Sequence, residues 1–381
     1  SAGATVPGRK RQQNIMETTR LRAILETGVK ARASDWYIRE NSPVMLRIDG
    51  GLKNMSDVVT SKEFLLEAVS EIISDKSLEE FDKTGDTNFA ILVNRIGRFR
   101  INLYRQRGLM AMVMRHVKAA VPLLDELGLP ETILDIANSQ RGIVLVTGTT
   151  GSGKSTTLAC MMEHMNRTFE RHIITIEDPI EYTFTNDKCI FDQREVGLDT
   201  SSFHSALVNS LRQDPDVIVV GEMRTREGFD AALQAADTGH LVLTTLHTTN
   251  ASQSVQRILD FYPHGERDQI RLALATNLRA IISQRLIPRA IGKGVVPGVE
   301  IMINSPLVRK LLGQDQLSKL PNAIEASTEE GMQSFDQGLL HLVNEGAITE
   351  EIAMERATNP EGLKMNLQGI FLNTDNAIIE G

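Results

Sequence analysis

The pattern of hydrophobic and polar positions divides the chain into two regions. In the first region, residues 15–121, apolar residues recur with helical spacing in two segments and alternate in four others. The predicted helices and strands of this region are 16–33 and 61–78, and 44–48, 88–93, 97–104 and 109–116. Asp49-Gly50-Gly51 signals a hairpin. This pattern predicts a smaller α+β domain, in which a helix pair packs on an antiparallel sheet.

The second region, residues 133–381, repeats the order strand, loop, helix and then turns helical after about residue 265. The predicted strands are 142–147, 173–176, 216–220 and 241–246, and the predicted helices are 154–166, 203–212, 268–286, 306–312, 331–344 and 350–357. Strands alternating with helices predict an α/β domain with a mostly parallel sheet covered on both faces. The turn-rich segment 122–132 is expected to be a linker, and 1–14 a disordered tail.

A glycine-rich loop joins the strand at 142–147 to the helix that follows it. It fits the phosphate-loop pattern Gly148-x4-Gly153-Lys154-Ser155. Its glycines let backbone N–H groups surround a phosphate, and the helix N-terminus adds partial positive charge. Lys154 is expected to contact the β- and γ-phosphates and the Ser155 hydroxyl to contact Mg²⁺. The residues expected to bind ATP are Gly148, Thr149, Thr150, Gly151, Ser152, Gly153, Lys154, Ser155 and Thr156.

Acidic residues follow two further predicted strands. Glu222 ends the apolar run at 217–220, and Glu177, Asp178 and Glu181 follow the strand at 173–176. Parallel sheets bind ligands at the carboxyl ends of their strands, so Glu222 is expected to polarise the attacking water or to hold a metal-bound water. The alternative is a solvated strand end. Like charges as close as Glu177 and Glu181 repel unless a cation offsets them, which Mg²⁺ and its water shell would do.

Two histidines, His240 and His247, bracket the apolar strand at 241–246. Seven residues of strand span about 20 Å, at roughly 3.3 Å per residue, so the pair cannot share one metal ion. One histidine is expected to sense the γ-phosphate, and a structural role is the alternative.

Composition narrows the possible functions. The net charge is −8, with 41 basic and 49 acidic residues, which disfavours a broad nucleic-acid-binding face. Cys160 and Cys189 are expected to be reduced structural thiols. No apolar stretch reaches a membrane-spanning length and no signal peptide is recognised, which points to the cytoplasm.

Together these motifs resemble the secretion ATPases of type II secretion and type IV pili. The order is that of the family: Walker A (148–155), Asp box (176–181), atypical Walker B (211–224) and His box (238–248). The short N-terminal region and the lack of a zinc-binding insertion resemble the pilus-retraction branch, PilT/PilU. The resemblance implies a PAS-like N-terminal domain and a RecA-like P-loop ATPase core, assembled as a homo-hexamer.

The resemblance also implies roles for individual residues. It makes Glu222 the catalytic glutamate, Glu177 and Glu181 the Asp-box carboxylates that order metal and water, and His240 and His247 the His-box pair. Arg100 and Arg115 match the arginines that reach the γ-phosphate in that family. From the residues alone, arginines on an antiparallel sheet are usually a solvated face, so both readings stay open.

Two departures refine the resemblance. Thr225 stands where the family usually has Asp, and the C-terminal retraction motif is degenerate at 307–312. The Thr225 variant, together with Leu211-Arg212-Gln213, resembles the PilU-like type more than the PilT-like type. The implied function is a motor ATPase that powers pilus retraction (twitching motility) at the inner face of the inner membrane. It would contact the membrane only through partners, an inner-membrane platform protein and a PilT-like ATPase. The alternatives are an accessory ring subunit and a RecA-like nucleic-acid translocase.

Overall fold

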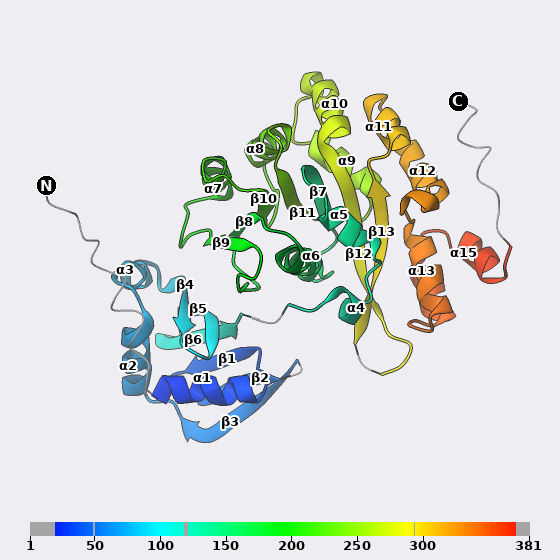
Figure 1. Cartoon of the computed structure of the whole chain (residues 1–381). Helices are drawn as coiled ribbons and strands as arrows, with labels where there is room; N and C mark the ends of the chain where they lie inside the picture. The colour runs from blue at the N-terminus through cyan, green and yellow to red at the C-terminus, as the bar shows by residue number, and fades with distance from the viewer. Residues whose placement is uncertain (1–19, 49, 118–120, 293, 371–381) are drawn as a thin grey trace, which may run out of the picture. The chain divides into compact units, whose positions relative to one another are not determined.

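The chain forms two compact units, Ser1–Ala120 and Val121–Gly381 (Figure 1). The computed structural model describes residues 20–48, 50–117, 121–292 and 294–370. The tail predicted at 1–14 lies outside the described residues. No helix in the described residues is both long enough and apolar enough to cross a bilayer.

The described part of the N-terminal unit is an antiparallel sheet in the order β3-β2-β1-β6-β5-β4, with helices packed on it. Its helices are α1 (Arg20–Lys30), α2 (Lys62–Ile72) and α3 (Asp75–Thr84), and its strands are β1 (Asp35–Arg39), β2 (Pro43–Ile48), β3 (Gly51–Val59), β4 (Asp86–Val93), β5 (Gly97–Gln106) and β6 (Leu109–His116). This confirms the predicted helix-on-antiparallel-sheet arrangement. The predicted hairpin joins β2 to β3, with Asp49 itself outside the described residues.

Trp36 on β1 is the centre of the N-terminal core. It is fully buried, its ring lies edge-on to Phe99 at 5.3 Å, and its indole Nε1 donates to the carbonyl of Ile24 at 3.1 Å. Helix α1 approaches the indole so closely that a Cβ at Gly28 would lie 2.4 Å from the ring. The contact therefore requires glycine at this position of α1.

The helix predicted at 61–78 is two helices. Ser61 caps α2, since its hydroxyl accepts from the Phe64 N–H at 3.2 Å. The helix ends at Ile72, and Ser74 then caps α3 by accepting from the Ser77 N–H at 3.2 Å. A serine that can bond a nearby backbone N–H competes with the continuing helix, and this interrupts an otherwise continuous apolar stripe.

The C-terminal unit contains a sheet in the order β13-β12-β7-β11-β10-β8-β9, in which only the β12–β13 pair of the described strands is antiparallel. Its strands are β7 (Gly142–Thr147), β8 (His172–Glu177), β9 (Ile190–Glu195), β10 (Val217–Val220), β11 (Leu241–Leu246), β12 (Leu278–Pro288) and β13 (Val295–Ile303). The predicted mostly parallel sheet is confirmed.

Helices cover both faces of this sheet. They are α4 (Leu124–Leu127), α5 (Thr132–Ala137), α6 (Lys154–Thr168), α7 (Phe203–Ser210), α8 (Arg226–Asp237), α9 (Ala251–Leu259), α10 (Arg267–Asn277), α11 (Pro306–Gly313), α12 (Leu320–Ala326), α13 (Phe335–Asn344), α14 (Glu350–Arg356) and α15 (Pro360–Leu367), with short 3₁₀ turns at His264–Glu266, Leu317–Lys319 and Thr328–Glu330. Helices α11, α12 and α13 follow one another beside β13 (Figure 1).

Alternate residues of β7 serve two separate cores. Ile143 and Leu145 pack with α8, α9 and α10, whereas Val144 and Val146 pack with α5 and α6. Side chains alternate between the faces of a strand, so a strand buried on both faces is apolar at every position. Burial of each such side chain contributes about 1.5–3 kcal/mol to the free energy of folding. This explains why the central strands stand out in the sequence as uninterrupted apolar runs.

Two predictions for this unit are corrected. The helix predicted at 268–286 ends at Asn277, and the chain continues as β12, which pairs with β7 and β13. Pairing with two buried neighbours outweighs the modest helix preference of this segment. The segment 122–132, expected to be a linker, includes α4, and its Leu124 and Leu129 are buried in the core of the C-terminal unit.

Candidate nucleotide site

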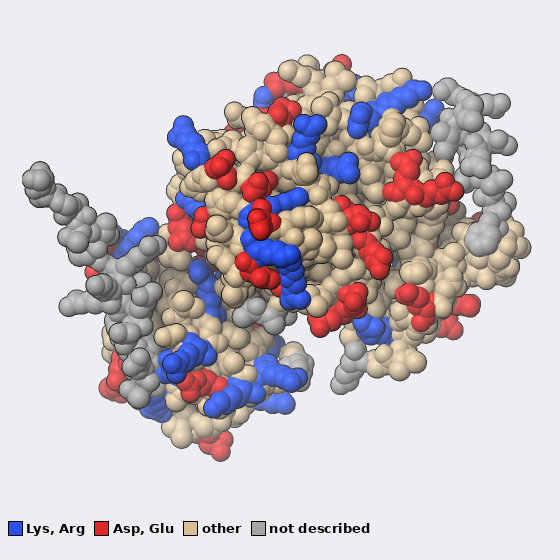
Figure 2. All heavy atoms as spheres, in the orientation of Figure 1, with Lys and Arg blue, Asp and Glu red and all other residues tan. Residues whose placement is uncertain are grey.

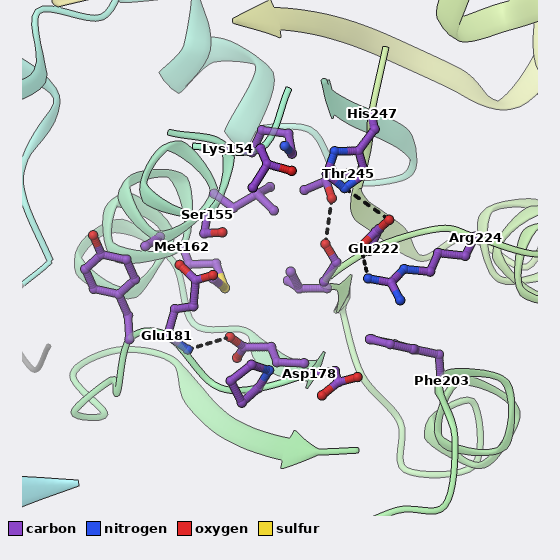
Figure 3. A pocket seen from close by; sticks show the side chains of 18 of the residues that line it. Lys154, Ser155, Met162, Asp178, Glu181, Phe203, Glu222, Arg224, Thr245 and His247 are labelled. Atoms are coloured by element: carbon purple, nitrogen blue, oxygen red, sulfur yellow. Dashed lines mark hydrogen bonds and ion pairs between the residues drawn. The ribbon is translucent and has the colours of Figure 1, made fainter. Parts of the chain in front are cut away.

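The carboxyl ends of parallel strands β7, β8, β10 and β11 meet at one edge of the sheet and surround a cavity (Figure 3). A parallel sheet places ligand-binding groups at this edge. The residues that line the cavity include Thr150, Gly151, Lys154, Ser155, Glu177, Asp178, Glu181, Tyr182, Phe203, Glu222, Arg224, Thr245 and His247. The structure thus brings together residues of the predicted Walker A, Asp box, Walker B and His box segments.

The phosphate loop folds as the glycine pattern predicts. Gly148 and Gly153 have φ values of +148° and +91°, and a Cβ at Gly148 would lie 2.4 Å from the Gln284 carbonyl oxygen. Only glycine fits there without displacing backbone. Helix α6 begins at Lys154, so its first N–H groups face the loop. The loop and the helix N-terminus together form an anion-binding site.

Lys154 is folded over this loop. Its Nζ donates to the carbonyls of Gly148 at 2.8 Å and Thr149 at 2.9 Å. Burial lowers the pKa of Lys154, and the carboxylates of Glu222 and Glu181 oppose that shift. The nearby carboxylates thus favour the charged form of Lys154. A partly buried ammonium group attracts a phosphate anion more strongly than one in water does.

Glu222 is held from two sides. Its Oε2 accepts from Arg224 at 2.6 Å, and its Oε1 lies 3.1 Å from His247 Nε2 (Figure 3). Burial raises the pKa of this carboxyl, but the hydrogen bond from Arg224 and the charges of His247 and Arg224 outweigh it, so the pKa lies below its ordinary value. Glu222 is therefore a carboxylate at neutral pH, as a residue that accepts a proton from water or orients it must be.

The Asp-box carboxylates lie across the cavity from Glu222. Glu177 accepts from the Thr175 hydroxyl at 2.7 Å and from the Glu181 N–H at 3.3 Å, and burial raises its pKa. Glu181 is exposed on the cavity wall (Figure 3). In the described part of the chain, no three His, Cys, Asp or Glu side chains converge to hold a metal ion by themselves. Ser155, Glu177, Glu181 and Glu222 all line the one cavity, however.

His240 and His247 are separated by the strand between them. His247 follows β11 and lines the cavity, whereas His240 precedes β11 and so lies at the other edge of the sheet. There the His240 Nδ1 is 3.0 Å from both the Ala235 carbonyl and the Thr238 hydroxyl, at the end of α8. The geometry within this unit therefore places only His247 at the site predicted for both histidines.

Arg100 and Arg115 belong to the N-terminal unit. They are opposite each other on β5 and β6, and Asp35 is opposite Arg115 on β1. Arg115 Nε donates to Asp35 Oδ1 at 2.7 Å; the Arg115 side chain is 62% exposed and that of Asp35 is buried. Both arginines therefore lie in one cross-strand row, and their predicted role at the γ-phosphate stays a prediction.

Sequence reasoning did not identify several residues that shape the site. Gln284 on β12 donates through Nε2 to the Ser152 carbonyl at 2.8 Å, and Thr245 donates to the Gly221 carbonyl at 2.7 Å. Arg224 ends the predicted Walker B segment, 211–224, and its bond to Glu222 becomes visible only in the structure. The sequence marks Gln284 only weakly, as the middle of three polar residues, 283–285, that interrupt an apolar run, and the incorrect helix prediction hid this signal.

Comparison with known proteins agrees with this site. The family described as type II/IV secretion system protein matches residues 10–357. The type IV pilus ATPase PilU of Pseudomonas aeruginosa is 41% identical over 348 residues, covering 91% of this chain and 90% of the relative. The type IV pilus retraction ATPase PilT of the same organism is 40% identical over 338 residues, covering 89% and 98%.

Solved structures give the same result. The crystal structure of the pilus retraction motor PilT with bound ADP has a TM-score of 0.83 at 41% identity, covering 91% of this chain and 99% of that one. The Legionella pneumophila ATPase DotB has a TM-score of 0.70 at 27% identity, covering 87% and 94%. With its phosphate loop and strand-end carboxylates in one cavity, the chain belongs to the type II/IV secretion system protein family and is an ATPase of that family.

Proposed function

We propose that this chain is the ATP-hydrolysing subunit of a motor that retracts type IV pili and so drives twitching motility. One observation carries the proposal: Lys154, Glu222 and His247 line one cavity in a chain that is 40% identical to a retraction ATPase over nearly all of that relative. The cavity residues and the sequence identity are both needed, because a phosphate loop alone fits many nucleotide-binding proteins.

Each of these cavity residues has its own role in the proposed hydrolysis of ATP. Lys154 leaves the loop carbonyls to contact the β- and γ-phosphates, and Glu222 orients water for in-line attack on the γ-phosphate. Mg²⁺ fits the oxygen donors that line the cavity: Ser155 would hold it directly, and Glu177 and Glu181 would order the water around it. When bound, it supplies positive charge that offsets the charge developing on the phosphates.

We also propose a domain architecture and an assembly, both supported by the resemblance to the same family. We assign residues 15–121 to a PAS-like domain and residues 133–381 to a RecA-like core, assembled as a homo-hexamer. In this assembly Arg100 and Arg115 act as arginine fingers that contact the γ-phosphate of ATP. The ring works in the cytoplasm at the inner face of the inner membrane, where a platform protein of the pilus machinery is its partner.

We expect no nucleic-acid partner. The net charge is −8, and on the face of the C-terminal unit shown in Figure 2 blue and red side chains are interspersed. A protein that neutralises phosphates along a strand instead needs a continuous basic surface. Turnover that rises with added DNA or RNA in a salt-dependent way would contradict this expectation.

The proposal is tested in the bacterium that carries the gene. A strain in which Glu222→Gln replaces the wild-type residue is expected to assemble pili but to lose twitching, while Glu351→Gln, an exposed change on α14, leaves twitching intact. Mass measurement of the purified chain with nucleotide is expected to give a hexamer. Normal twitching in the Glu222→Gln strain contradicts a motor driven by this site.

A second candidate is an accessory ring subunit that supports a PilT-like ATPase. It is favoured by Thr225, which stands where the family usually has Asp, while the identities to PilU (41%) and PilT (40%) are nearly equal. Thr225 caps α8 by accepting from the Gly228 N–H at 3.2 Å, so its role here includes a local structural one. Turnover of the purified chain alone, compared with a mixture containing a PilT-like partner, separates the two candidates.

A further inference from the structure

We propose that Gln284 is a positioning residue of the nucleotide site: it fixes the direction in which the phosphate loop presents the Gly153 N–H. The inference rests on the proposed function only in that the loop binds nucleotide phosphates. Gln284 is on β12, outside the motifs that identify the family, and its side chain is 3% exposed.

The amide of Gln284 bridges the loop and the helix that follows it. Its Nε2 donates to the Ser152 carbonyl at 2.8 Å, and its Oε1 accepts from the Thr157 hydroxyl at 2.7 Å. A carbonyl oxygen only accepts, so the amide NH₂ has to face Ser152. The orientation of Gln284 is therefore set by its two partners, one at the end of the loop and one in the second turn of α6.

The bond to Ser152 determines the direction of a neighbouring donor. In a planar trans peptide the C=O of one residue and the N–H of the next point in opposite directions. With the Ser152 carbonyl held toward β12, the Gly153 N–H points away from β12. This N–H is one of the backbone donors that a phosphate loop offers to its anion. Gln284 thus fixes a phosphate donor without touching the phosphate.

Gln284 itself is held rigidly. Its strand pairs with β7 on one side and with β13 on the other, where Gln284 is opposite Val299. One residue before it, Ser283 Oγ accepts from the Thr147 hydroxyl at 3.0 Å, a buried bond between β12 and β7. The loop packs directly against the amide, since a Cβ at Gly153 would lie 2.6 Å from Gln284 Nε2. The Gln284 amide is therefore packed closely against the peptide whose direction it fixes.

Two substitutions distinguish positioning from mere satisfaction of buried polar groups. Gln284→Leu removes both bonds, whereas Thr157→Val removes only the bond to Oε1 and leaves Ser152 held. Each change leaves a buried polar atom without a partner, so each lowers the unfolding temperature of the nucleotide-free protein. Binding of ADP, measured by calorimetry on the purified full chain, is expected to weaken about tenfold in Gln284→Leu and less than about threefold in Thr157→Val.

A third variant, Gln284→Glu, tests the positioning role through the pH dependence of ADP binding, which a loss of stability alone would not explain. In Gln284→Glu a carboxylate accepts from Thr157 but cannot donate to Ser152, whereas a protonated carboxyl can do both. The ADP affinity of Gln284→Glu relative to wild type is therefore expected to recover as the pH falls from about 8 to about 5, a range in which a buried Glu titrates. This variant also decides the matter if Gln284→Leu does not fold.

Three results overturn the inference: an ADP affinity of Gln284→Leu equal to that of wild type, an equal loss in Gln284→Leu and Thr157→Val, or a Gln284→Glu affinity whose ratio to wild type does not change with pH. The wild-type protein separates this failure from failure of the proposed function. If the wild-type protein does not bind ADP, the assignment of the nucleotide site is wrong. If the wild-type protein binds ADP and any one of the three overturning results is found, only the role proposed for Gln284 is wrong.

Discussion

Glu222 and His247 lie 3.1 Å apart, Oε1 to Nε2, although they follow different strands, β10 and β11. The two strands are parallel neighbours in the sheet, so their carboxyl ends lie side by side. Arg224 binds the other oxygen of Glu222 at 2.6 Å. The carboxylate is thus oriented by one group on its own segment and by one group on the next strand.

Replacing Glu222 tests its assignment as the group that orients water. Glu222→Gln keeps the shape of the side chain but cannot accept a proton, so kcat for ATP is expected to fall by about 10²–10⁴-fold. ADP affinity is expected to stay within about threefold of wild type, because Lys154 and the loop supply most of the phosphate contacts. Steady-state phosphate release and ADP calorimetry measure the two quantities. Unchanged turnover would mean that another residue performs this role.

Arg224 is expected to control the pH dependence of turnover. Burial alone raises the pKa of Glu222, and Arg224 is foremost among the groups that bring it below the ordinary value. A lowered pKa keeps the carboxylate ionised until the pH falls below that of an ordinary glutamate, so stability and activity that depend on the charged form are lost only in more acidic solution. In Arg224→Ala the acid limb of kcat/KM should move up by about one pH unit. Arg289→Ala, an exposed change on the same unit, should not move it.

Lys154 is expected to be needed for binding rather than for folding. Lys154→Ala removes the one ammonium group that lines the described cavity, and charge-assisted phosphate contacts of this kind contribute about 10- to 100-fold in affinity. ADP affinity should fall by that factor. Lys188→Ala, whose Nζ contacts the Thr168 carbonyl at the far end of α6, is the matched control and should bind like wild type. If Lys154→Ala bound ADP as tightly as wild type, the loop would not be part of the nucleotide site.

The pair Arg115 and Asp35 allows the arginine prediction to be separated from stability. Arg115→Ala leaves the buried Asp35 with Ser34 at 2.8 Å and Arg47 at 3.7 Å, so it is expected to lower the unfolding temperature as well as turnover. Adding Asp35→Asn removes the buried charge that has lost its nearest cation and should restore stability. If Arg115 is an arginine finger, the double variant stays about 10³-fold slower than wild type. Turnover restored together with stability would show that Arg115 acts only through Asp35.

Both cysteines are expected to be unreactive in the folded protein. Burial raises the pKa of Cys160 to about 11, with the charges of Asp125 and Glu163 adding to the shift, and burial also raises the pKa of Cys189. The thiolate is the reactive form, so iodoacetamide at about pH 8 should label neither residue until denaturant is added. Mass spectrometry of tryptic peptides provides the measurement, and rapid labelling of native Cys160 would contradict the buried position on α6.

The elements that the sequence predicts well are those whose neighbours leave a local signature. Strand β7 is apolar at every position because helices cover both faces, and the phosphate loop has glycines where positive φ and close packing require them. Strand β9, Ile190–Glu195, lies at the edge of the sheet and reads as a polar segment. Strand β12 reads as a helix because its preference is decided by pairing with β7, more than 100 residues earlier. Local sequence patterns do not indicate pairing between strands so far apart in the sequence.

The candidate site likewise combines residues that the sequence identifies with residues that only the structure identifies. The sequence identifies Lys154 and Glu222 because each follows a strand in a recognisable pattern. It cannot show which end of β11 faces the cavity, so His240 and His247 are equivalent in the sequence and separate in the structure. Contacts between distant segments are also invisible: Arg115 and Asp35 are 80 residues apart, and Gln284 and Ser152 are 132 apart.

The grouping of the N-terminal sheet and helices within residues 20–117 has a consequence for biosynthesis. The described core of this unit comes from one continuous stretch, so it can form on the ribosome while later residues are still being made. The phosphate loop is translated soon afterwards, but its supporting strand β12 follows more than 120 residues later. A nascent chain should therefore contain a folded first unit well before it has a loop able to bind nucleotide, which protects the unfinished motor from engaging ATP too early.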